Sequence, residues 1–375
     1  MFDISFFQKT SELKNQILNG DVSYDDIIMI EKALDQMRSK QPCLFNMETT
    51  NHCNMTCQMC PRTTLMTRDI SWIDKELFES VLDQIEPHSE QSLEEFWNFV
   101  QKNYGITFDQ RGENAFYFYV VSRCVILHGF GEPLVDKNIA ARVQVCTDMG
   151  IPTYFSCVPA NISVKRAESV MKAGLSVIKF SMDAMTDEQQ KSIRGDHNDF
   201  KKSYQTMLDV IKMKKEKGYK TLIVPTMISF NEDEQAHEMH QQFLDLWKGM
   251  DVFAYVKSQD NRWYFEDDDK LENRSHYESQ YCEFPWSSTT VMADGSVVPC
   301  TQDFNCEMVM GNVQETTLEE IWNGEKYKCL RNFHVTGDFP KGHKCNERCD
   351  QKKLYQRLAA TSSEKEAPGD ASRYV

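Results

Sequence analysis

The chain has 375 residues, of which 41% are hydrophobic and 26% are charged, and its formal net charge is −15. This balance is ordinary for a globular protein, and the acidic charge argues against a nucleic-acid partner. No apolar run reaches the length of a membrane span, and residues 1–7 lack the features of a signal peptide. We therefore expect a cytoplasmic protein with one full domain and a smaller one, and no membrane partner.

Cysteine is unusually frequent, with thirteen residues. The reducing cytosol argues against a disulfide framework, which leaves metal binding or redox chemistry as the reason. Most of these cysteines fall in two groups, at residues 53–60 and 282–349. This layout predicts two metal centres.

Residues 1–42 are expected to form helices at 11–18 and 23–37, the second capped by Ser23 and Asp26. From Cys43 onward, strands alternate with helices, which is typical of a parallel α/β domain. The predicted strands are 44–48, 124–128, 152–156, 177–181, 222–228 and 252–256. The predicted helices between them are 75–85, 139–148, 165–173, 200–217 and 232–247.

Three cysteines follow the first predicted strand, at a spacing that lets one loop wrap around a metal centre. They are Cys53, Cys57 and Cys60. Thiolates suit an iron–sulfur cluster or zinc, but a zinc site needs a fourth nearby ligand, which this loop does not supply. The CxxxCxxC pattern resembles the cluster loop of the radical S-adenosylmethionine (radical SAM) superfamily.

That resemblance implies a partial (β/α)6 barrel of the TIM type over residues 43–258, with the cysteine loop where barrel chemistry gathers. It implies a [4Fe-4S] cluster on the three cysteines, whose open iron binds S-adenosylmethionine (SAM), and a flavodoxin or ferredoxin electron donor. In the family, an electron from the cluster cleaves SAM, and the 5′-deoxyadenosyl radical that forms abstracts a hydrogen atom from the substrate.

An insertion at about 87–121 is longer than an ordinary connection. Its pattern predicts a helix at 93–102 and two strands, 106–108 and 116–121, around a turn. The insertion either covers the barrel mouth or binds a partner, or it is a surface decoration.

After the second predicted strand, residues 128–133 resemble the GGE motif of the family, with Phe130 in place of one glycine. Glycines let a backbone approach a ligand, and a carboxylate can accept from an ammonium group. The resemblance assigns Gly129, Gly131 and Glu132 to the amino group of SAM.

The fourth predicted strand ends in Ser181, and Arg194 follows. They resemble family residues that reach the ribose and carboxylate of SAM. Asn231, after the fifth strand, stands where relatives often carry a polar residue. Asp183 belongs to the same segment or caps the next helix.

Two positions depart from the family pattern. Met59 stands where relatives often have an aromatic residue near the adenine. Cys157 follows the third strand, where relatives often have a Ser-Thr-Asn-Gly-like turn. Cys157 is either a buried, inert thiol or a catalytic hydrogen-atom donor.

The second cysteine group resembles the SPASM/twitch extension of radical SAM enzymes. A hairpin signal at 293–296 lies between Cys282 and Cys300 and would bring them together. With Cys345 and Cys349, these residues fit a twitch-like frame, which implies one auxiliary [4Fe-4S] cluster in a small cysteine-rich domain, residues 259–357. Four thiolates also suit structural zinc.

Two cysteines of this region lie outside that frame. Cys306 either replaces a ligand or faces the substrate as a catalytic thiol, and Cys329 packs in a helix or serves as a ligand. The tail, 358–375, is small and polar and is expected to be disordered.

An auxiliary cluster is useful when a substrate radical must lose a second electron. The cysteine frame resembles relatives that oxidise an aminocyclitol alcohol, which favours dehydrogenation of a small sugar- or cyclitol-like molecule. One alternative is modification of a peptide, but the 40 mostly helical residues before the barrel leave no room for a peptide-recognition sheet. A second is epimerisation, which needs a thiol donor. A third is a non-catalytic electron carrier.

Overall fold

The computed structural model describes residues 1–231, 233–259, 281–349, 353–356 and 358. No helix in this part of the chain is long and apolar enough to cross a membrane. The predicted tail from 359 onward lies outside the described residues.

Six parallel strands form the main part of the sheet and pair in sequence order. They are β1 (Leu44–Met47), β2 (Val125–Ile126), β3 (Thr153–Cys157), β4 (Val177–Ser181), β5 (Leu222–Ser229) and β6 (Tyr255–Ser258). The predicted β4 is confirmed to the residue, whereas β6 begins three residues later than predicted. The expected (β/α)6 arrangement is confirmed.

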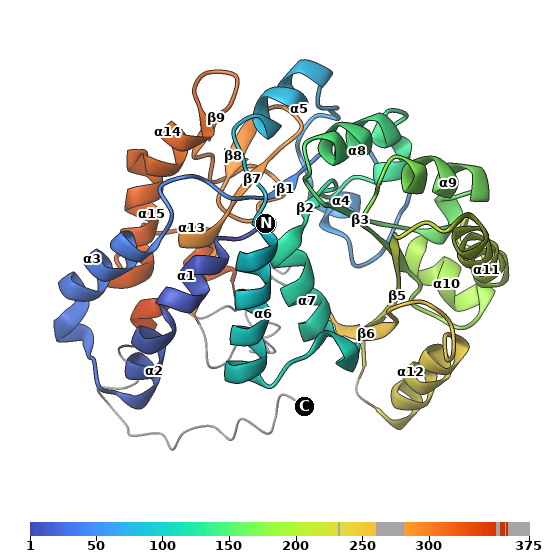
Figure 1. The fold of residues 1–375 in the computed structure, drawn as a ribbon, viewed down its shortest axis with the longest axis horizontal. Helices are drawn as coiled ribbons and strands as arrows, with labels where there is room; N and C mark the ends of the chain where they lie inside the picture. Colours follow the sequence, from blue (N-terminus) through green and yellow to red (C-terminus); the bar gives the residue numbers. More distant parts are fainter. Residues whose placement is uncertain (232, 260–280, 350–352, 357, 359–375) are drawn as a thin grey trace.

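Helices connect these strands, and several cover the outer face of the sheet (Figure 1). They are α4 (Pro61–Thr64), α5 (Lys75–Leu82), α8 (Ile139–Asp148), α9 (Val164–Lys172), α10 (Asp187–Arg194), α11 (Phe200–Lys217) and α12 (Glu234–Leu246). Short 3-10 turns are η3 (Pro133–Val135) and η4 (Pro159–Asn161). Apolar side chains of α5, α8, α9 and α11 share one core with strand residues such as Val125, Ile178 and Ile223.

The insertion differs from the prediction, because it is helical throughout. It forms α6 (Glu90–Tyr104), the turn η2 (Phe108–Gln110) and α7 (Glu113–Arg123), where two strands were expected. The residues of α7 are buried on most sides, including Phe116, Phe118 and Val120. A helix with apolar residues all round has no clear 3.6-residue period, and its aromatic and β-branched residues imitate a strand.

The insertion lies against the inner face of the sheet. Side chains of α6 and α7 pack with Phe45, Ile126, Tyr154 and Val177, which alternate along their strands with the residues of the outer core. Phe45 and Val177 stand near the amino-terminal ends of β1 and β4. The insertion therefore packs on the inner face, and Glu113 at the start of α7 also reaches the carboxyl-terminal end of β6, where its Oε2 accepts from the N–H of Ser258 at 3.1 Å.

The C-terminal segment extends the sheet beyond β1. Strand β7 (Thr289–Val291) pairs in parallel with β1, and β8 (Ser296–Val298) and β9 (Gly311–Asn312) continue it in antiparallel. The hairpin predicted at 293–296 is confirmed, with Gly295 at φ +84°. Helices α13 (Phe284–Ser287), α14 (Leu318–Asn323), α15 (Glu325–Thr336) and α16 (Lys344–Glu347) complete the segment.

The N-terminal helices pack on this C-terminal segment. They are α1 (Ile4–Lys9), α2 (Ser11–Asn19), the turn η1 (Tyr24–Asp26) and α3 (Ile27–Met37), and Figure 1 shows α3 beside α15. The Ser23 N–H donates to Asp26 Oδ2 at 2.9 Å, but this pair lies at η1, and α3 begins four residues later than predicted, after Asp26. A buried ion pair joins Lys14 to Glu283.

Candidate active site and auxiliary cluster site

The three cysteines of the first group lie in the loop between β1 and α4. Cys53, Cys57 and Cys60 gather in one apolar cluster with Met59 and with residues of the loop after β3. Burial raises the pKa of Cys53 to about 12 and also raises the pKa values of Cys57 and Cys60. Since metal ligands must be thiolates, loading this loop releases protons.

Arg194 is held against this loop. Its Nη1 donates to the sulfur of Cys57 at 3.7 Å, and its Nε and Nη2 pair with the carboxylate of Asp183. Asp183 in turn accepts from the N–H of Ile228 at 2.9 Å. The helix α10 is capped by Thr186, so Asp183 is not its cap. Asp183 instead fixes the guanidinium of Arg194 beside a thiol of the first group.

The segment after β2 packs tightly on the segment after β1. A Cβ atom on Gly131 would lie 2.1 Å from the carbonyl oxygen of Thr50, and one on Gly129 would lie 2.4 Å from the Glu48 carboxylate. The Glu132 N–H donates to the carbonyl of His52 at 2.9 Å. In this structure, these glycines therefore allow two segments of the chain, after β1 and after β2, to lie close together.

Glu132 joins three segments around the first cysteine group. Its buried carboxylate accepts from the N–H groups of Leu134 and Val158, both at 3.1 Å. Burial raises the pKa of Glu132 to about 7, against the opposing effect of these hydrogen bonds. The expected role with the SAM amino group stays a prediction, and the contacts show a carboxylate that orders the loop after β3.

Ser181 lies at the end of β4, where its Oγ is 3.3 Å from Oγ of Ser156. Asn231 is exposed after β5, and its carbonyl accepts from Oγ of Ser229 at 2.9 Å. Ser181 thus lies with the hydroxyl of Ser156 at the carboxyl-terminal edge of the sheet. The assignment of Asn231 to SAM stays a prediction.

The structure argues against Cys157 as a donor at the barrel mouth. Its side chain is 2% exposed and lies in the outer core, between the sheet and the helices. Burial raises the pKa of Cys157 well above its ordinary value. The periodicity of β3 places this residue opposite to Ser156, so the expectation of a catalytic thiol here is corrected.

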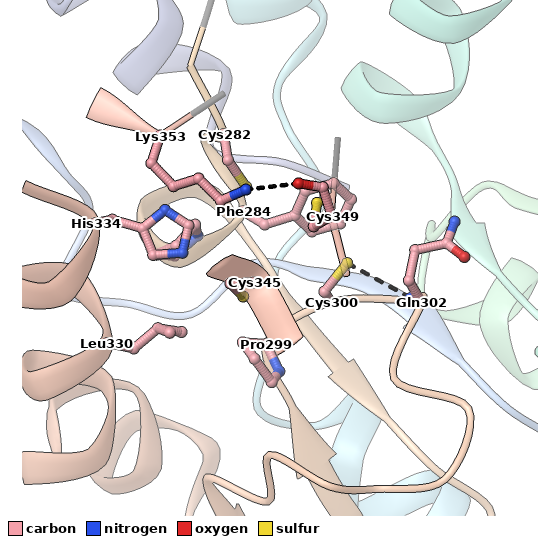
Figure 2. A pocket seen from close by; sticks show the side chains of 11 residues that line it. Cys282, Phe284, Pro299, Cys300, Gln302, Leu330, His334, Cys345, Cys349 and Lys353 are labelled. Atoms are coloured by element: carbon pink, nitrogen blue, oxygen red, sulfur yellow. Dashed lines mark hydrogen bonds between the residues drawn. The ribbon is translucent and has the colours of Figure 1, made fainter. Parts of the chain in front are cut away.

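Four cysteines of the second group line one cavity, which Figure 2 shows with its other lining side chains. Cys282 precedes α13, Cys300 follows β8, Cys345 lies in α16 and Cys349 follows that helix. The predicted twitch-like frame is thus brought together. Within the described residues, no three His, Cys, Asp or Glu side chains converge as a single metal ion requires. Four thiolates around one cavity suit a [4Fe-4S] cluster, as they also suit structural zinc.

The two remaining cysteines of this region do not line the cavity. Cys306, at φ +56°, lies in the loop after β8 in the electrostatic environment of Arg68 and Asp303. Cys329 is exposed on α15. Cys306 therefore lies outside the four-cysteine cavity, and the expectation that Cys329 packs is wrong because its side chain is exposed.

Three polar side chains of the cavity carried no signal in the sequence, namely Gln302, His334 and Lys353. The Nζ of Lys353 donates to the carbonyl of Cys349 at 2.7 Å (Figure 2). A single histidine in a helix and a lysine near the end of the chain carry no spacing signal, so only the fold reveals them.

Polar side chains on the inner face of the sheet were also missed. His128 accepts at Nδ1 from the N–H of Ser156 at 3.2 Å, and burial lowers the pKa of His128 to about 3. Lys179 alternates with the outer-core residues of β4, and its Nζ is 5.9 Å from the ring centroid of Tyr154. Burial, with a smaller effect of Lys257, lowers the pKa of Lys179 to about 7.

Comparison with known proteins agrees with these two sites. The family model described as the radical SAM superfamily matches residues 47–243, and the SPASM model, described as an iron-sulfur cluster-binding domain, matches residues 282–350. A curated relative from Niallia circulans, an S-adenosyl-L-methionine-dependent 2-deoxy-scyllo-inosamine dehydrogenase, is 21% identical over 305 residues, which cover 80% of this chain and 90% of that protein.

Two solved structures are similar in fold. Streptococcus suis SuiB bound to the precursor peptide SuiA matches with a TM-score of 0.52 at 12% identity, covering 92% of this chain and 78% of that chain. BtrN in complex with AdoMet and 2-DOIA matches with a TM-score of 0.43 at 16% identity, covering 78% and 87%. The cofactors that the two family models imply are SAM, a [4Fe-4S] cluster and auxiliary iron–sulfur clusters. Because the radical SAM model spans more than half of the chain and includes the three-cysteine loop after β1, the chain is an enzyme of the radical SAM superfamily.

Proposed function

We propose that this enzyme oxidises an alcohol of a small sugar- or cyclitol-like molecule to a carbonyl. The observation that carries the proposal is the cavity lined by Cys282, Cys300, Cys345 and Cys349. A second cluster at this place gives a substrate radical an electron acceptor, which oxidation requires. The related 2-deoxy-scyllo-inosamine dehydrogenase from Niallia circulans supports the same class of reaction.

The first cluster site is assigned to Cys53, Cys57 and Cys60. Bound SAM and its cluster supply the radical that removes a hydrogen atom from the alcohol carbon. The chain's own part is to shape the loop: Glu132 ties it to the loop after β3, and Arg194 holds a positive charge next to Cys57. This charge stabilises the thiolate form that a cluster ligand needs.

The substrate is proposed to bind at the carboxyl-terminal edge of the inner sheet face. Ser156, Ser181, His128 and Lys179 place hydroxyl, imidazole and amine groups there, which suit a polyhydroxylated molecule. In the overall reaction, the alcohol carbon would lose a hydrogen atom and the hydroxyl a proton, and a cluster held by the four cysteines would accept the remaining electron. A flavodoxin or ferredoxin is proposed to reduce the first cluster.

The placement of the thiols weighs against epimerisation, which needs a hydrogen-atom donor. Cys157 faces the outer core, and Cys306 lies beside Arg68 and Asp303. The helices within residues 1–42 pack on α6, α13 and α15.

The test is deuterium transfer from a candidate cyclitol labelled at the alcohol carbon. We expect deuterium in 5′-deoxyadenosine and one carbonyl product for each SAM cleaved. A Cys282→Ala/Cys345→Ala variant is expected to cleave SAM but to form less than a tenth of the carbonyl product. The panel of enzymes measured includes Cys306→Ala. The proposal is contradicted if deuterium is transferred but the product is the alcohol with inverted configuration instead of the carbonyl.

A further inference from the structure

His334 is a buried histidine without a hydrogen-bond partner at either ring nitrogen. It lies on α15, is 1% exposed, and has no partner for Nδ1 or Nε2 among the described residues. Its ring is fixed between two aromatic side chains, with ring centroids 6.0 Å from Trp286 and 5.2 Å from Phe339. Leaving two buried polar atoms unsatisfied costs free energy, so this residue calls for a partner.

The unsatisfied imidazole lies at the auxiliary cluster site. His334 lines the same cavity as Cys282, Cys300, Cys345 and Cys349, and Figure 2 shows its ring on the side of α15, across from the thiols. Leu330 and Phe284 in the lining are apolar, and the amine of Lys353 donates to the carbonyl of Cys349. Among the described residues, the imidazole of His334 is therefore available to donate a hydrogen bond to a ligand in this cavity.

We infer that His334 donates an N–H hydrogen bond to a sulfur of the auxiliary cluster and thereby raises the reduction potential of that cluster. An imidazole carries at least one N–H in either protonation state, so the bond does not depend on titration. A donor stabilises the reduced cluster, which carries one more negative charge, more than the oxidised one. The inference rests on the proposed function, since it makes the cluster a better acceptor of the substrate's electron.

The measurement is the midpoint potential of the auxiliary cluster, by EPR-monitored redox titration. The full chain is used with Cys53, Cys57 and Cys60 replaced by Ala, so that only the auxiliary signal remains. We expect His334→Phe to keep about four irons per chain. We expect its midpoint potential to fall by about 59 mV, which corresponds to a tenfold change in the equilibrium constant of one-electron reduction. His334→Gln, whose amide keeps an N–H, is expected to recover part of the shift.

The matched control is His240→Phe, because His240 on α12 also has a buried ring nitrogen, Nε2, without a partner among the described residues. It lies outside the lining of the cavity and is expected to leave the potential unchanged. Labelling histidine with 15N gives a second readout, since a hydrogen-bonded nitrogen couples weakly to the reduced cluster and a direct ligand couples strongly.

Three results overturn the inference. They are a potential shift in His334→Phe no larger than in His240→Phe, a strong 15N coupling, and loss of iron from both His334→Phe and His334→Gln while His240→Phe retains it. If the chain with an intact His334 holds no iron in the triple-alanine background, the four-cysteine cluster of the proposed function fails instead. The two failures are therefore distinguishable.

Discussion

Arg68 and Glu48 form a two-pronged ion pair, with Nη1–Oε1 at 2.9 Å and Nη2–Oε2 at 2.8 Å. Glu48 follows β1, and Arg68 also donates from Nε to the carbonyl of Phe304 at 2.7 Å. Next to it, the N–H of Thr67 donates to the side chain of Asn305 at 2.8 Å. The pair thus joins the segment after α4, the end of β1 and the loop that follows Cys300.

Replacing Arg68 by Met is expected to lower the free energy of unfolding by about 3–5 kcal/mol, because it leaves the fully buried Glu48 without its cation. Urea titration measures this loss. Lys75→Met is the matched control, since Lys75 pairs with Glu79 on an exposed helix surface, where substitutions change stability by about 0.5 kcal/mol or less. Equal losses in the two variants would refute the coupling role of Arg68.

Gly131→Ala is expected to disrupt the junction between the segments after β1 and β2. Its Cβ would lie 2.1 Å from the carbonyl oxygen of Thr50, so one backbone segment must move. We expect a lower thermal midpoint and weaker iron retention at the first site. Gly112→Ala is the control, because its Cβ would meet no atom within 4 Å and its φ of −121° suits alanine. Unchanged midpoints in both variants would show that the junction tolerates the methyl group.

Iron counting separates the two cluster sites. After anaerobic reconstitution we expect about eight irons per chain, and about four in Cys282→Ala/Cys345→Ala. Cys329→Ala, at an exposed position outside the cavity, is expected to retain about eight. A wild-type value of about four would contradict the second cluster.

Lys179 predicts a pH dependence of stability. Its pKa falls from 10.5 to about 7 on burial, so between these values the unfolded chain binds the proton more fully than the folded chain does. Stability due to this residue therefore rises with pH from about 7 to 10.5. The thermal midpoint of the wild type minus that of Lys179→Met is expected to be larger at pH 9 than at pH 7. Lys172→Met serves as an exposed control. A difference that falls with pH would contradict the shift.

Spacing and periodicity predicted the parallel strands and the cysteine groups, because both signals are local in the sequence. Strands β1, β3, β4 and β5 agree with their predicted ranges within one residue at each end, whereas β2 is three residues shorter and β6 begins three residues later. The hairpin at Gly295 follows from its turn residues. Helix α7 could not be predicted, because its burial on most sides results from the sheet and α6, which the local pattern does not show.

Site residues that depend on distant contacts were also out of reach. His334 is 34 residues from Cys300 and 11 from Cys345 in the sequence, and only the packing of α15 brings it to the cavity. Likewise, the facing direction of Cys157 depends on the register of β3, which a shift of one residue would reverse. Motifs thus identified the cysteines that the fold brings together, and tertiary packing decides their surroundings.

The pairing of β7 with β1 has a consequence for the order in which the molecule becomes complete. Strand β1 joins partners that lie about 80 residues and about 245 residues later in the chain, so its second edge stays unpaired until almost the whole polypeptide is available. An unpaired edge of a buried parallel strand is a template for intermolecular association. A fragment that stops at residue 258 is therefore expected to aggregate, even though it contains the complete first cysteine loop and all six parallel strands.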